Sequence, residues 1–158
     1  MSKTNNLYYT EVLTSLDSSQ LKSLIDLEID AFPGIGSVDE QTLVPISRYG
    51  KIVLFRETGD PRAIAVCELM RDYNQPNRAY VFAFYVRSDK KGTGIGGKFL
   101  HEILLLLKED GFQTVCLTVD VNNTAAIKLY EKLGFITKLT REAEYGEGED
   151  RYFMDLEL

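Results

Sequence analysis

Histidine is the scarcest of the catalytic residue types in this sequence: His101 is the only one among 158 residues. One histidine excludes a histidine-rich metal site, and it argues against a serine–histidine triad built anywhere else in the chain. The apolar residues around His101 recur at helical spacing and leave it on the opposite, polar face. We therefore expect a solvated surface residue without a catalytic role, and we predict no metal site.

Cysteine and long apolar runs are scarce as well. Cys67 and Cys116 each lie in an apolar, strand-like run, which predicts two buried free thiols rather than a disulfide framework. No apolar run approaches the length of a membrane span, and the first residues, MSKTNNLYYT, lack the apolar core of a signal peptide. We predict a cytoplasmic protein that has no membrane partner.

Basic residues are outnumbered by acidic ones, 18 against 24, which gives a net charge of −6. This balance disfavours nucleic acid as a partner, because non-specific binding relies on a basic surface. It mildly favours a cationic partner, but a modest negative charge also keeps an ordinary protein soluble, and on charge alone the second explanation is preferred. The length suits a single domain, residues 1–158.

Hydrophobic periodicity and turn residues predict a mixed α/β chain. Asp17 with Gln20, and Ser37 with Glu40, have the spacing of helix capping boxes. The segment 79–86 is apolar on both faces and is expected to be a central strand covered on both sides. The predicted elements are strand 7–14, helices 18–32 and 38–49, strands 51–57, 62–70 and 79–86, helix 94–110, strand 114–121, helix 124–133, and strands 136–145 and 150–158.

The loop KKGTGIGGKFL, residues 90–100, has four glycines within six residues and is typical of a phosphate-binding turn. The sequence disfavours a P-loop because Phe99 stands where the magnesium-binding hydroxyl belongs. Gly92, Gly94 and Gly97 also fit the dinucleotide fingerprint, with Asp120 near the place of a ribose-binding acid. That makes an NAD-binding protein a minor alternative, since RSDKK separates the strand from the first glycine and only one clear βαβ unit is present.

A third interpretation needs neither a metal nor a ribose-binding acid. Backbone N–H groups of the glycine loop, followed by the N-terminus of a helix, can hold a pyrophosphate. The stretch VRSDKKGTGIGGKFL followed by VNNTAAIKLYEKLGF resembles the GCN5-related N-acetyltransferase (GNAT) superfamily. Lys91 to Gly96 has the spacing of the family's loop, although a lysine replaces its usual arginine or glutamine. The two motifs cover about residues 79–135.

The resemblance implies a GNAT fold: a mixed, mostly antiparallel central sheet of about seven strands, flanked by about four helices. Two neighbouring parallel strands, 79–86 and 114–121, would splay apart to admit the cofactor. The implied cosubstrate is acetyl-CoA, with no metal. The implied cofactor-binding residues are Tyr85, Val86, Lys91, Gly92, Thr93, Gly94, Ile95, Gly96, Gly97, Asn123, Ala126 and Tyr130.

Asn123 and Tyr130 are seven residues apart and so share one helix face, roughly 10 Å apart along the axis. The resemblance makes Tyr130 the general acid for the departing thiolate, with Ala126 leaving space for the cofactor. Taken alone, Asn123 would be a helix cap and Tyr130 a core aromatic; the matched motif reverses that preference.

The general base is left open by the sequence. Many relatives place a glutamate at the position of Tyr80 and others at that of Thr118, and neither residue is a carboxylate here. Glu68 and Asp120 are weak candidates. The alternative to a catalytic role is that Glu68 is a carboxylate at the edge of the core and that Asp120 ends a strand beside a helix cap.

We predict an N-acetyltransferase that moves an acetyl group from acetyl-CoA to a primary amine by direct attack in a ternary complex. The acceptor is a small-molecule amine or a protein N-terminus, and the protein is a monomer or a homodimer. The alternative is a non-catalytic CoA-binding module with a GNAT fold.

Overall fold

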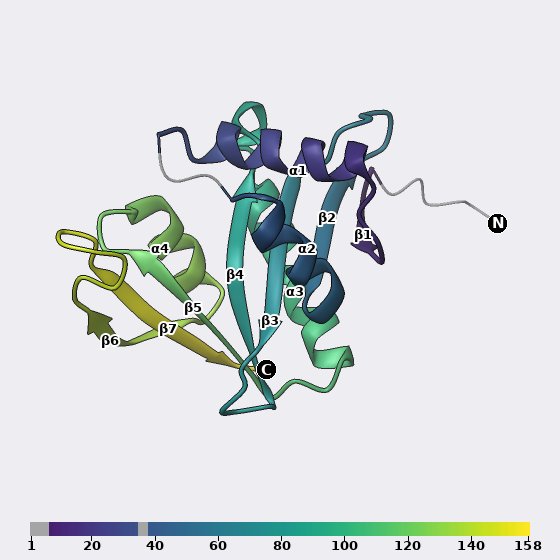
Figure 1. Cartoon of the computed structure of the whole chain (residues 1–158). Helices are drawn as coiled ribbons and strands as arrows, with labels where there is room; N and C mark the ends of the chain where they lie inside the picture. The colour runs from purple at the N-terminus through teal and green to yellow at the C-terminus, as the bar shows by residue number, and fades with distance from the viewer. Residues whose placement is uncertain (1–6, 35–37) are drawn as a thin grey trace. The chain divides into compact units, whose positions relative to one another are not determined.

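The structure is a computed structural model, and it describes residues 7–34 and 38–158. The helices and strands follow the predicted order (Figure 1). They are β1 (Tyr8–Leu13), α1 (Ser18–Ala31), α2 (Glu40–Tyr49), β2 (Lys51–Glu57), β3 (Ala65–Arg71), β4 (Arg78–Val86), α3 (Ile95–Glu109), β5 (Thr114–Asp120), α4 (Thr124–Lys132), β6 (Ile136–Arg141) and β7 (Arg151–Glu157), with one 3-10 turn at Ser88–Lys90.

The strands form one seven-stranded sheet in the order β1-β2-β3-β4-β5-β7-β6. Strand β2 pairs antiparallel with β1 and β3, and β7 pairs antiparallel with β5 and β6. Strands β4 and β5 are parallel, and their pairing runs from Arg78–Thr114 to Val81–Leu117, although both strands continue beyond it. The predicted fold, a mixed and mostly antiparallel sheet with four helices, is therefore confirmed.

The chain divides into two compact units. The first consists of residues 1–69 and 83–99, and the second of residues 70–82 and 100–158. Strand β4 and helix α3 each contribute to both units, so neither unit is a continuous stretch of sequence. The single domain over residues 1–158 stays a prediction.

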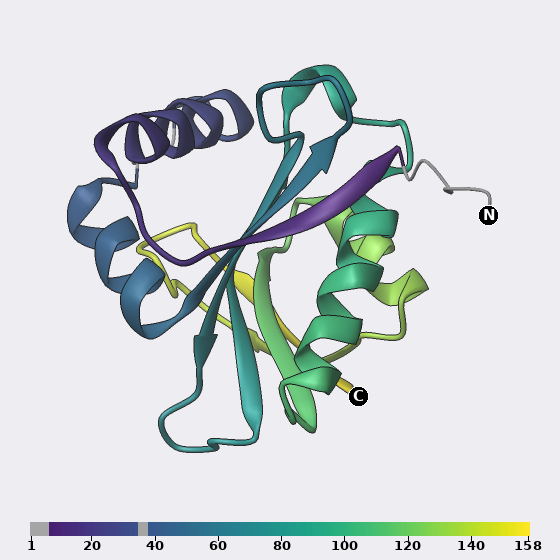
Figure 2. The same ribbon diagram turned by 90° about the vertical axis from the view of Figure 1, so that its right-hand side faces the viewer.

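The core of the first unit lies between the sheet and helices α1 and α2, which cover one face of the strands (Figure 2). Strand β2 alternates across this sheet: Ile52 and Leu54 point into the core under α1 and α2. Phe55 points the other way and stacks on Phe99, with 4.9 Å between ring centroids. Phe99 is where α3 contributes to this unit, and Phe84 of β4 stacks on it at 5.5 Å. Strand β2 is thus apolar on both faces and packs against helical side chains on each of them.

Local signals set where the first two helices begin. At α1 the predicted capping box is present: the Asp17 carboxylate accepts from Gln20 N at 2.8 Å, and Asp17 N donates to Gln20 Oε1 at 3.0 Å. The predicted Ser37 cap lies outside the described residues. Helix α2 is capped by Asp39, whose carboxylate accepts from Thr42 N at 3.1 Å. A carboxylate at this position pairs with a backbone N–H of the first turn, because these N–H groups have no carbonyl partner within the helix.

The second unit is built on the β5–β7 ladder, which runs from Thr114–Glu157 to Asp120–Arg151. Cys116 is buried and so is Cys67 in the first unit, and both are free thiols, as predicted. Strand β4 departs from prediction: Phe82 is 38% exposed, so this strand is not covered along its whole length. None of the described helices is both long and apolar enough to span a membrane.

Candidate active site

The glycine loop between β4 and α3 has the backbone that its sequence predicts. Gly92 and Gly94 have φ angles of +74° and +81°, a conformation that costs any other residue strain. A Cβ atom at either position would meet nothing within 4 Å, so the requirement for glycine is one of backbone conformation and not of space. Helix α3 begins at the next residue, Ile95, so its unpaired N–H groups follow the turn directly.

Arg87, the residue that precedes this loop, is an anchor that sequence analysis missed. Its side chain is 4% exposed. It donates to the Asp60 carboxylate at 2.7 Å, to Asp89 at 2.6 Å and to the Ala63 carbonyl at 3.2 Å. Hydrogen bonds from the Arg87 guanidinium lower the pKa of both carboxyls. The start of the loop is thereby tied to the β2–β3 connection.

Two further contacts hold the same loop. Asp30, in the last turn of α1, accepts from Ser88 N at 2.8 Å and from Ser88 Oγ at 2.7 Å, and the backbone hydrogen bond is the main reason that its pKa is lowered. Lys90 pairs with Glu57 at the end of β2. The segment is therefore fixed to α1, to β2 and to the β2–β3 connection before any ligand is bound.

The predicted cofactor-binding residues of this loop differ in the solvent exposure of their side chains and backbone. Lys91, Gly92, Thr93 and Gly94 are exposed, and the Thr93 hydroxyl donates to the Lys90 carbonyl. The Ile95 side chain is buried in the core, so only its backbone is left for a ligand. Gly96 and Gly97 are half-buried in the first turn of α3. The single histidine, His101, is exposed, as predicted.

Strand β4 ends in Tyr85 and Val86, the predicted pantetheine strand. Val86 is half-buried, whereas Tyr85 is buried with its ring edge-on to Phe32 at 5.6 Å. The Tyr85 hydroxyl is buried and makes no hydrogen bond in the part of the chain that the structure describes. Burial raises its pKa well above the usual range.

Two buried carboxyls, those of Glu28 and Glu68, belong to the same unit as Tyr85. Glu68 is fully buried, neither of its carboxylate oxygens has a partner among the described residues, and burial followed by the nearby charge of Glu28 raises its pKa to about 8. Glu28 of α1 is also buried, and burial raises its pKa to about 7. Sequence analysis named Glu68 and missed Glu28. The available signal was a charge within the apolar stripe of α1, four residues after Leu24.

In the second unit, Asn123 caps α4 by accepting from Ala126 N at 3.2 Å through Oδ1. Tyr130 is buried, and its ring lies 5.6 Å from that of Phe135. Both residues therefore fill the structural roles weighed above, a helix cap and a core aromatic. These roles do not exclude cofactor contacts, because the cap engages only the carbonyl oxygen of the Asn123 amide. Ala126 is half-buried.

The remaining base candidate, Asp120, is half-buried at the end of β5 and accepts from Asn122 N at 2.7 Å. Its carboxylate thus stabilises the turn that leads into α4. The two positions where relatives place a glutamate come together: Tyr80 shares side-chain hydrogen bonding with Thr118 and Tyr145, and burial raises its pKa. Sequence analysis did not foresee this contact of Tyr145 with Tyr80.

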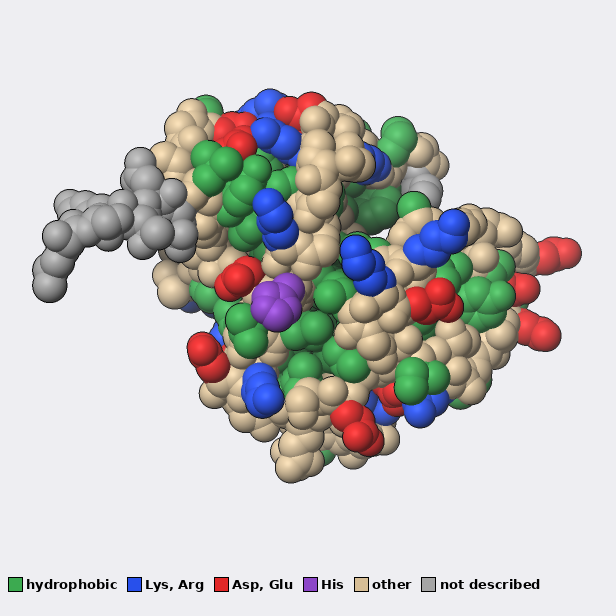
Figure 3. Space-filling model, turned by 180° about the vertical axis from the view of Figure 1, so that it is seen from behind, with side chains coloured by type: hydrophobic (Ala, Val, Ile, Leu, Met, Phe, Trp, Pro, Cys, Tyr) green, Lys and Arg blue, Asp and Glu red, His purple; other side chains and the backbone are tan. Residues whose placement is uncertain are grey.

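The connection between β6 and β7 carries an exposed acidic run. Figure 3 shows acidic side chains at the edge of the molecule over this connection, and the exposed members are Glu142, Glu144, Glu147 and Glu149. The run is held by Asp150, which accepts from Ala143 N at 2.8 Å. Within the described residues there is no group of three or more His, Cys, Asp or Glu side chains that could hold a metal ion.

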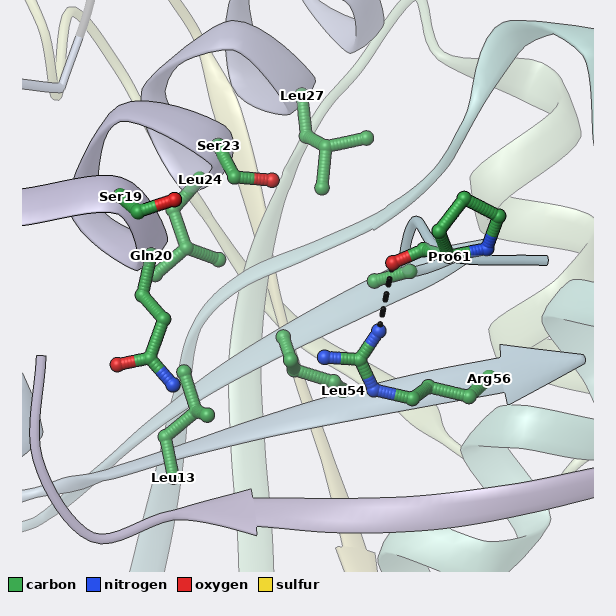
Figure 4. A pocket seen from close by; sticks show the side chains of 10 residues that line it. Leu13, Ser19, Gln20, Ser23, Leu24, Leu27, Leu54, Arg56 and Pro61 are labelled. Carbon is green, nitrogen blue, oxygen red and sulfur yellow. Dashed lines mark hydrogen bonds between the residues drawn. The ribbon is translucent and has the colours of Figure 1, made fainter. Parts of the chain in front are cut away.

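A separate pocket of about 170 Å³ lies in the first unit beneath α1 (Figure 4). Arg56 crosses it and donates to the Pro61 carbonyl at 3.3 Å, while Ser19, Gln20 and Ser23 line its polar side. Drug-sized ligands usually occupy pockets of about 300–1,000 Å³. The pocket is therefore too small for a nucleotide cofactor, and it contains none of the predicted site residues.

Comparison with known proteins bears on both units. The model of the "Acetyltransferase (GNAT) family" matches residues 21–135. The chain is 28% identical over 126 residues to the probable N-acetyltransferase san of Drosophila melanogaster, a match that covers 79% of this chain and 67% of that protein.

Solved structures agree with the fold. The ribosomal-protein-S18-alanine N-acetyltransferase of Escherichia coli superposes with a TM-score of 0.75 at 25% identity, over 94% of each chain. Naa50 of Arabidopsis thaliana, solved with the bisubstrate analogue CoA-Ac-MVNAL, superposes with a TM-score of 0.76 at 21% identity, over 96% of this chain and 99% of that one. At least one structural neighbour therefore binds a CoA derivative.

Proposed function

Because the chain belongs to the acetyltransferase (GNAT) family, we propose that it transfers an acetyl group from acetyl-CoA to a primary amine, by direct attack in a ternary complex. The observation that carries this proposal is the glycine loop. Its left-handed Gly92 and Gly94 lead straight into the N-terminus of α3, which is the backbone that a pyrophosphate requires. The segment is also held in place by Arg87, Ser88 and Lys90.

The pyrophosphate accepts from backbone N–H groups between Gly92 and Gly97, with Lys91 and Thr93 beside it and Ile95 contributing through its backbone alone. The pantetheine arm pairs with the backbone of β4 near Tyr85 and Val86. The Asn123 amide hydrogen-bonds the arm, and Ala126 leaves space for it. No metal takes part.

The chemistry assigned to the chain's residues is acyl transfer. A neutral amine attacks the thioester carbonyl, a C–N bond forms, and the carbonyl oxygen gains the charge of a tetrahedral oxyanion. A backbone N–H near Val86 stabilises that charge. As the C–S bond breaks, the Tyr130 hydroxyl donates its proton to the thiolate, and the resulting phenolate takes the surplus proton from the nitrogen.

The proton that the ammonium form of the amine must first lose needs an acceptor. Of the two candidates from sequence, Asp120 already stabilises a turn through Asn122, whereas Glu68 has two carboxylate oxygens without a described partner. A pKa of about 8 suits proton exchange near neutral pH. These contacts favour Glu68, acting directly or through the neighbouring Glu28 carboxyl, over Asp120.

The acceptor class is a primary amine, either a small molecule or a protein N-terminus. The relatives named above are N-acetyltransferases, and one of them acts on the alanine of ribosomal protein S18. The acidic run of the β6–β7 connection would attract a cationic amine. We place the protein in the cytoplasm, as a monomer or homodimer of a single catalytic domain over residues 1–158.

The first test is isothermal titration of the protein with acetyl-CoA, with NAD as the control for the dinucleotide alternative. Acetyl-CoA should bind and NAD should not; the reverse result would refute the proposal. CoA release is then measured with an alanine-initiated peptide, the peptide MVNAL and butylamine. Binding without release for any amine would favour a non-catalytic CoA-binding module.

A further inference from the structure

Among the residues that the structure describes, four buried oxygen atoms of the first unit have no hydrogen-bond partner. They are Glu28 Oε2, both carboxylate oxygens of Glu68 and the Tyr85 hydroxyl. Nearly all buried polar atoms in folded proteins make a hydrogen bond, so each one without a partner needs an explanation such as a ligand or a catalytic role. Four in one place are more than an isolated packing defect.

The three side chains come from three elements and reach the same side of the sheet. Glu28 lies in the buried stripe of α1. Glu68 follows Val66 by two residues and so leaves β3 on the same face, and Val66 and Tyr85 both belong to the core under α1. The charge of Glu28 raises the pKa of Glu68, and the charges of both raise the pKa of Tyr85, so the three are electrostatic neighbours.

Nothing else in the described surroundings neutralises the two carboxyls. Beside them, the Cys67 thiol also raises the pKa of Tyr85, and no lysine or arginine is among the causes of the three pKa shifts. The other elements that meet this core contribute apolar side chains: Leu43 and Ile46 from α2, and Ile52 and Leu54 from β2. The cluster is therefore rich in acceptors and poor in donors and positive charge.

A primary ammonium group matches this environment. It carries one positive charge and three N–H donors, whereas a water molecule brings two donors and no charge. A divalent metal is a poorer match, because the described residues offer no group of three metal-binding side chains. Glu28 is the most exposed of the three side chains, at 8%, while Tyr85 is 4% exposed and Glu68 is fully buried.

We propose that Glu28, Glu68 and Tyr85 form the subsite that receives the ammonium group of the acceptor, with Glu28 in contact with it. Glu28 then accepts the proton, and Glu68 is a positioning residue that acts on Glu28 through its charge. This inference rests on the acetyl transfer proposed above, and it adds that the acceptor is bound in its cationic form. The two carboxyls act as one coupled pair.

The proton balance is simple. The ammonium transfers one proton to the Glu28 carboxylate, which leaves a neutral amine and a carboxylic acid, and no electrons change hands. The amine then attacks the thioester as described above. After the N-acetyl product and CoA leave, Glu28 releases its proton to solvent. The net reaction converts one ammonium and one acetyl-CoA into one amide, one CoA thiol and one proton.

The kinetic test compares wild type with Glu28→Gln and Glu68→Gln. The matched control is Asp26→Asn, on the exposed face of the same helix, where Asp26 pairs with Lys22. For the wild type, kcat/KM with the best acceptor of the panel should rise with pH through the neutral range. Glu28→Gln should lose about 100-fold and flatten the profile, because the proton acceptor is gone. Glu68→Gln should move the midpoint to lower pH, because a like charge is removed.

A second measurement needs no turnover. Carbon-13 NMR of labelled glutamate carboxyls is followed against pH with butylammonium chloride or, at equal ionic strength, tetramethylammonium chloride, which has no N–H donor. Butylammonium should lower the titration midpoints of the two carboxyls, since a bound cation favours the charged form. Tetramethylammonium should leave them unchanged.

The outcomes separate this inference from the proposed function. If acetyl-CoA binds and is turned over but Glu28→Gln keeps the wild-type pH profile, the subsite is refuted and acetyl transfer stands. If no acetyl-CoA binds, acetyl transfer is refuted, and the NMR titration still decides whether the cluster takes an ammonium. Identical midpoints in the two salts would mean that the cluster holds water alone, which overturns the proposal.

Discussion

Replacement of Glu68 by glutamine should change how the stability of the fold depends on pH. Glu68 is fully buried without a hydrogen-bond partner among the described residues, and its pKa is raised from 4.5 to about 8. A carboxyl whose pKa is higher in the folded state binds a proton more tightly there than in the unfolded chain. Its stabilising contribution is therefore complete below pH 4.5 and is lost as the pH rises towards 8.

The size of the effect follows from the shift. One pKa unit corresponds to about 1.4 kcal/mol, so a shift from 4.5 to about 8 makes the free energy of unfolding fall by at most about 5 kcal/mol across that window. Between pH 5 and pH 7.5 the fall is about 3 kcal/mol. That is a large part of the roughly 5–15 kcal/mol that holds a domain of this kind together.

The assay is urea unfolding at several pH values between 5 and 8.5. Wild type should lose stability with pH, and Glu68→Gln, which cannot ionise, should lose about 1.4 kcal/mol less per pH unit. Glu102→Gln, on the exposed side of α3, is the control and should follow wild type. Parallel curves for Glu68→Gln and wild type would refute the reasoning, because Glu68 would then titrate in the folded state as it does in the unfolded chain.

Three further outcomes test the site. Gly94→Ala should weaken acetyl-CoA binding about 10-fold or more by calorimetry and cost about 1–2 kcal/mol of stability, whereas Gly59→Ala, with a similar φ of +91° in the β2–β3 connection, should show only the stability loss. Tyr130→Phe should lower kcat about 100-fold and leave the acetyl-CoA Kd unchanged; a falling affinity with constant kcat would contradict its role as an acid. Arg87→Ala should lower the free energy of unfolding by about 2–3 kcal/mol in urea and weaken acetyl-CoA binding, because the four hydrogen bonds of the Arg87 guanidinium are lost.

Local patterns were enough to predict much of the fold. The capping box at Asp17, the cap at Asn123 and the glycine loop around Gly94 depend on residues within a few positions of one another, and all three are present. The order of helices and strands along the chain also followed from hydrophobic periodicity and turn residues. Helix α2 is capped by Asp39, which the sequence pattern did not single out, whereas the predicted cap, Ser37, lies outside the described residues.

Contacts between distant parts of the chain were not predictable in this way. Arg87 reaches Asp60, 27 residues away, and Ser88 reaches Asp30, 58 residues away. Glu28 was passed over although it lies in the apolar stripe of α1, because a glutamate in an amphipathic helix is normally solvated and only the folded structure shows that this one is buried. The sequence could not decide which carboxyl is the general base, because the burial that raises the pKa of a carboxyl is a property of the folded chain.

The link between Asp30 and Ser88 has a consequence for how two ligands affect each other. Asp30 stands two residues after Glu28 on α1, and its carboxylate holds the first residue of the segment that leads to Gly92. A ligand that steadies the loop also steadies the helix end, and a ligand that steadies the helix end also steadies the loop. Thermodynamic linkage makes such assistance equal in both directions. If acetyl-CoA raises the affinity for the amine by some factor, the amine must raise the affinity for acetyl-CoA by the same factor. Asp30→Asn should therefore reduce these two increases in affinity by the same ratio.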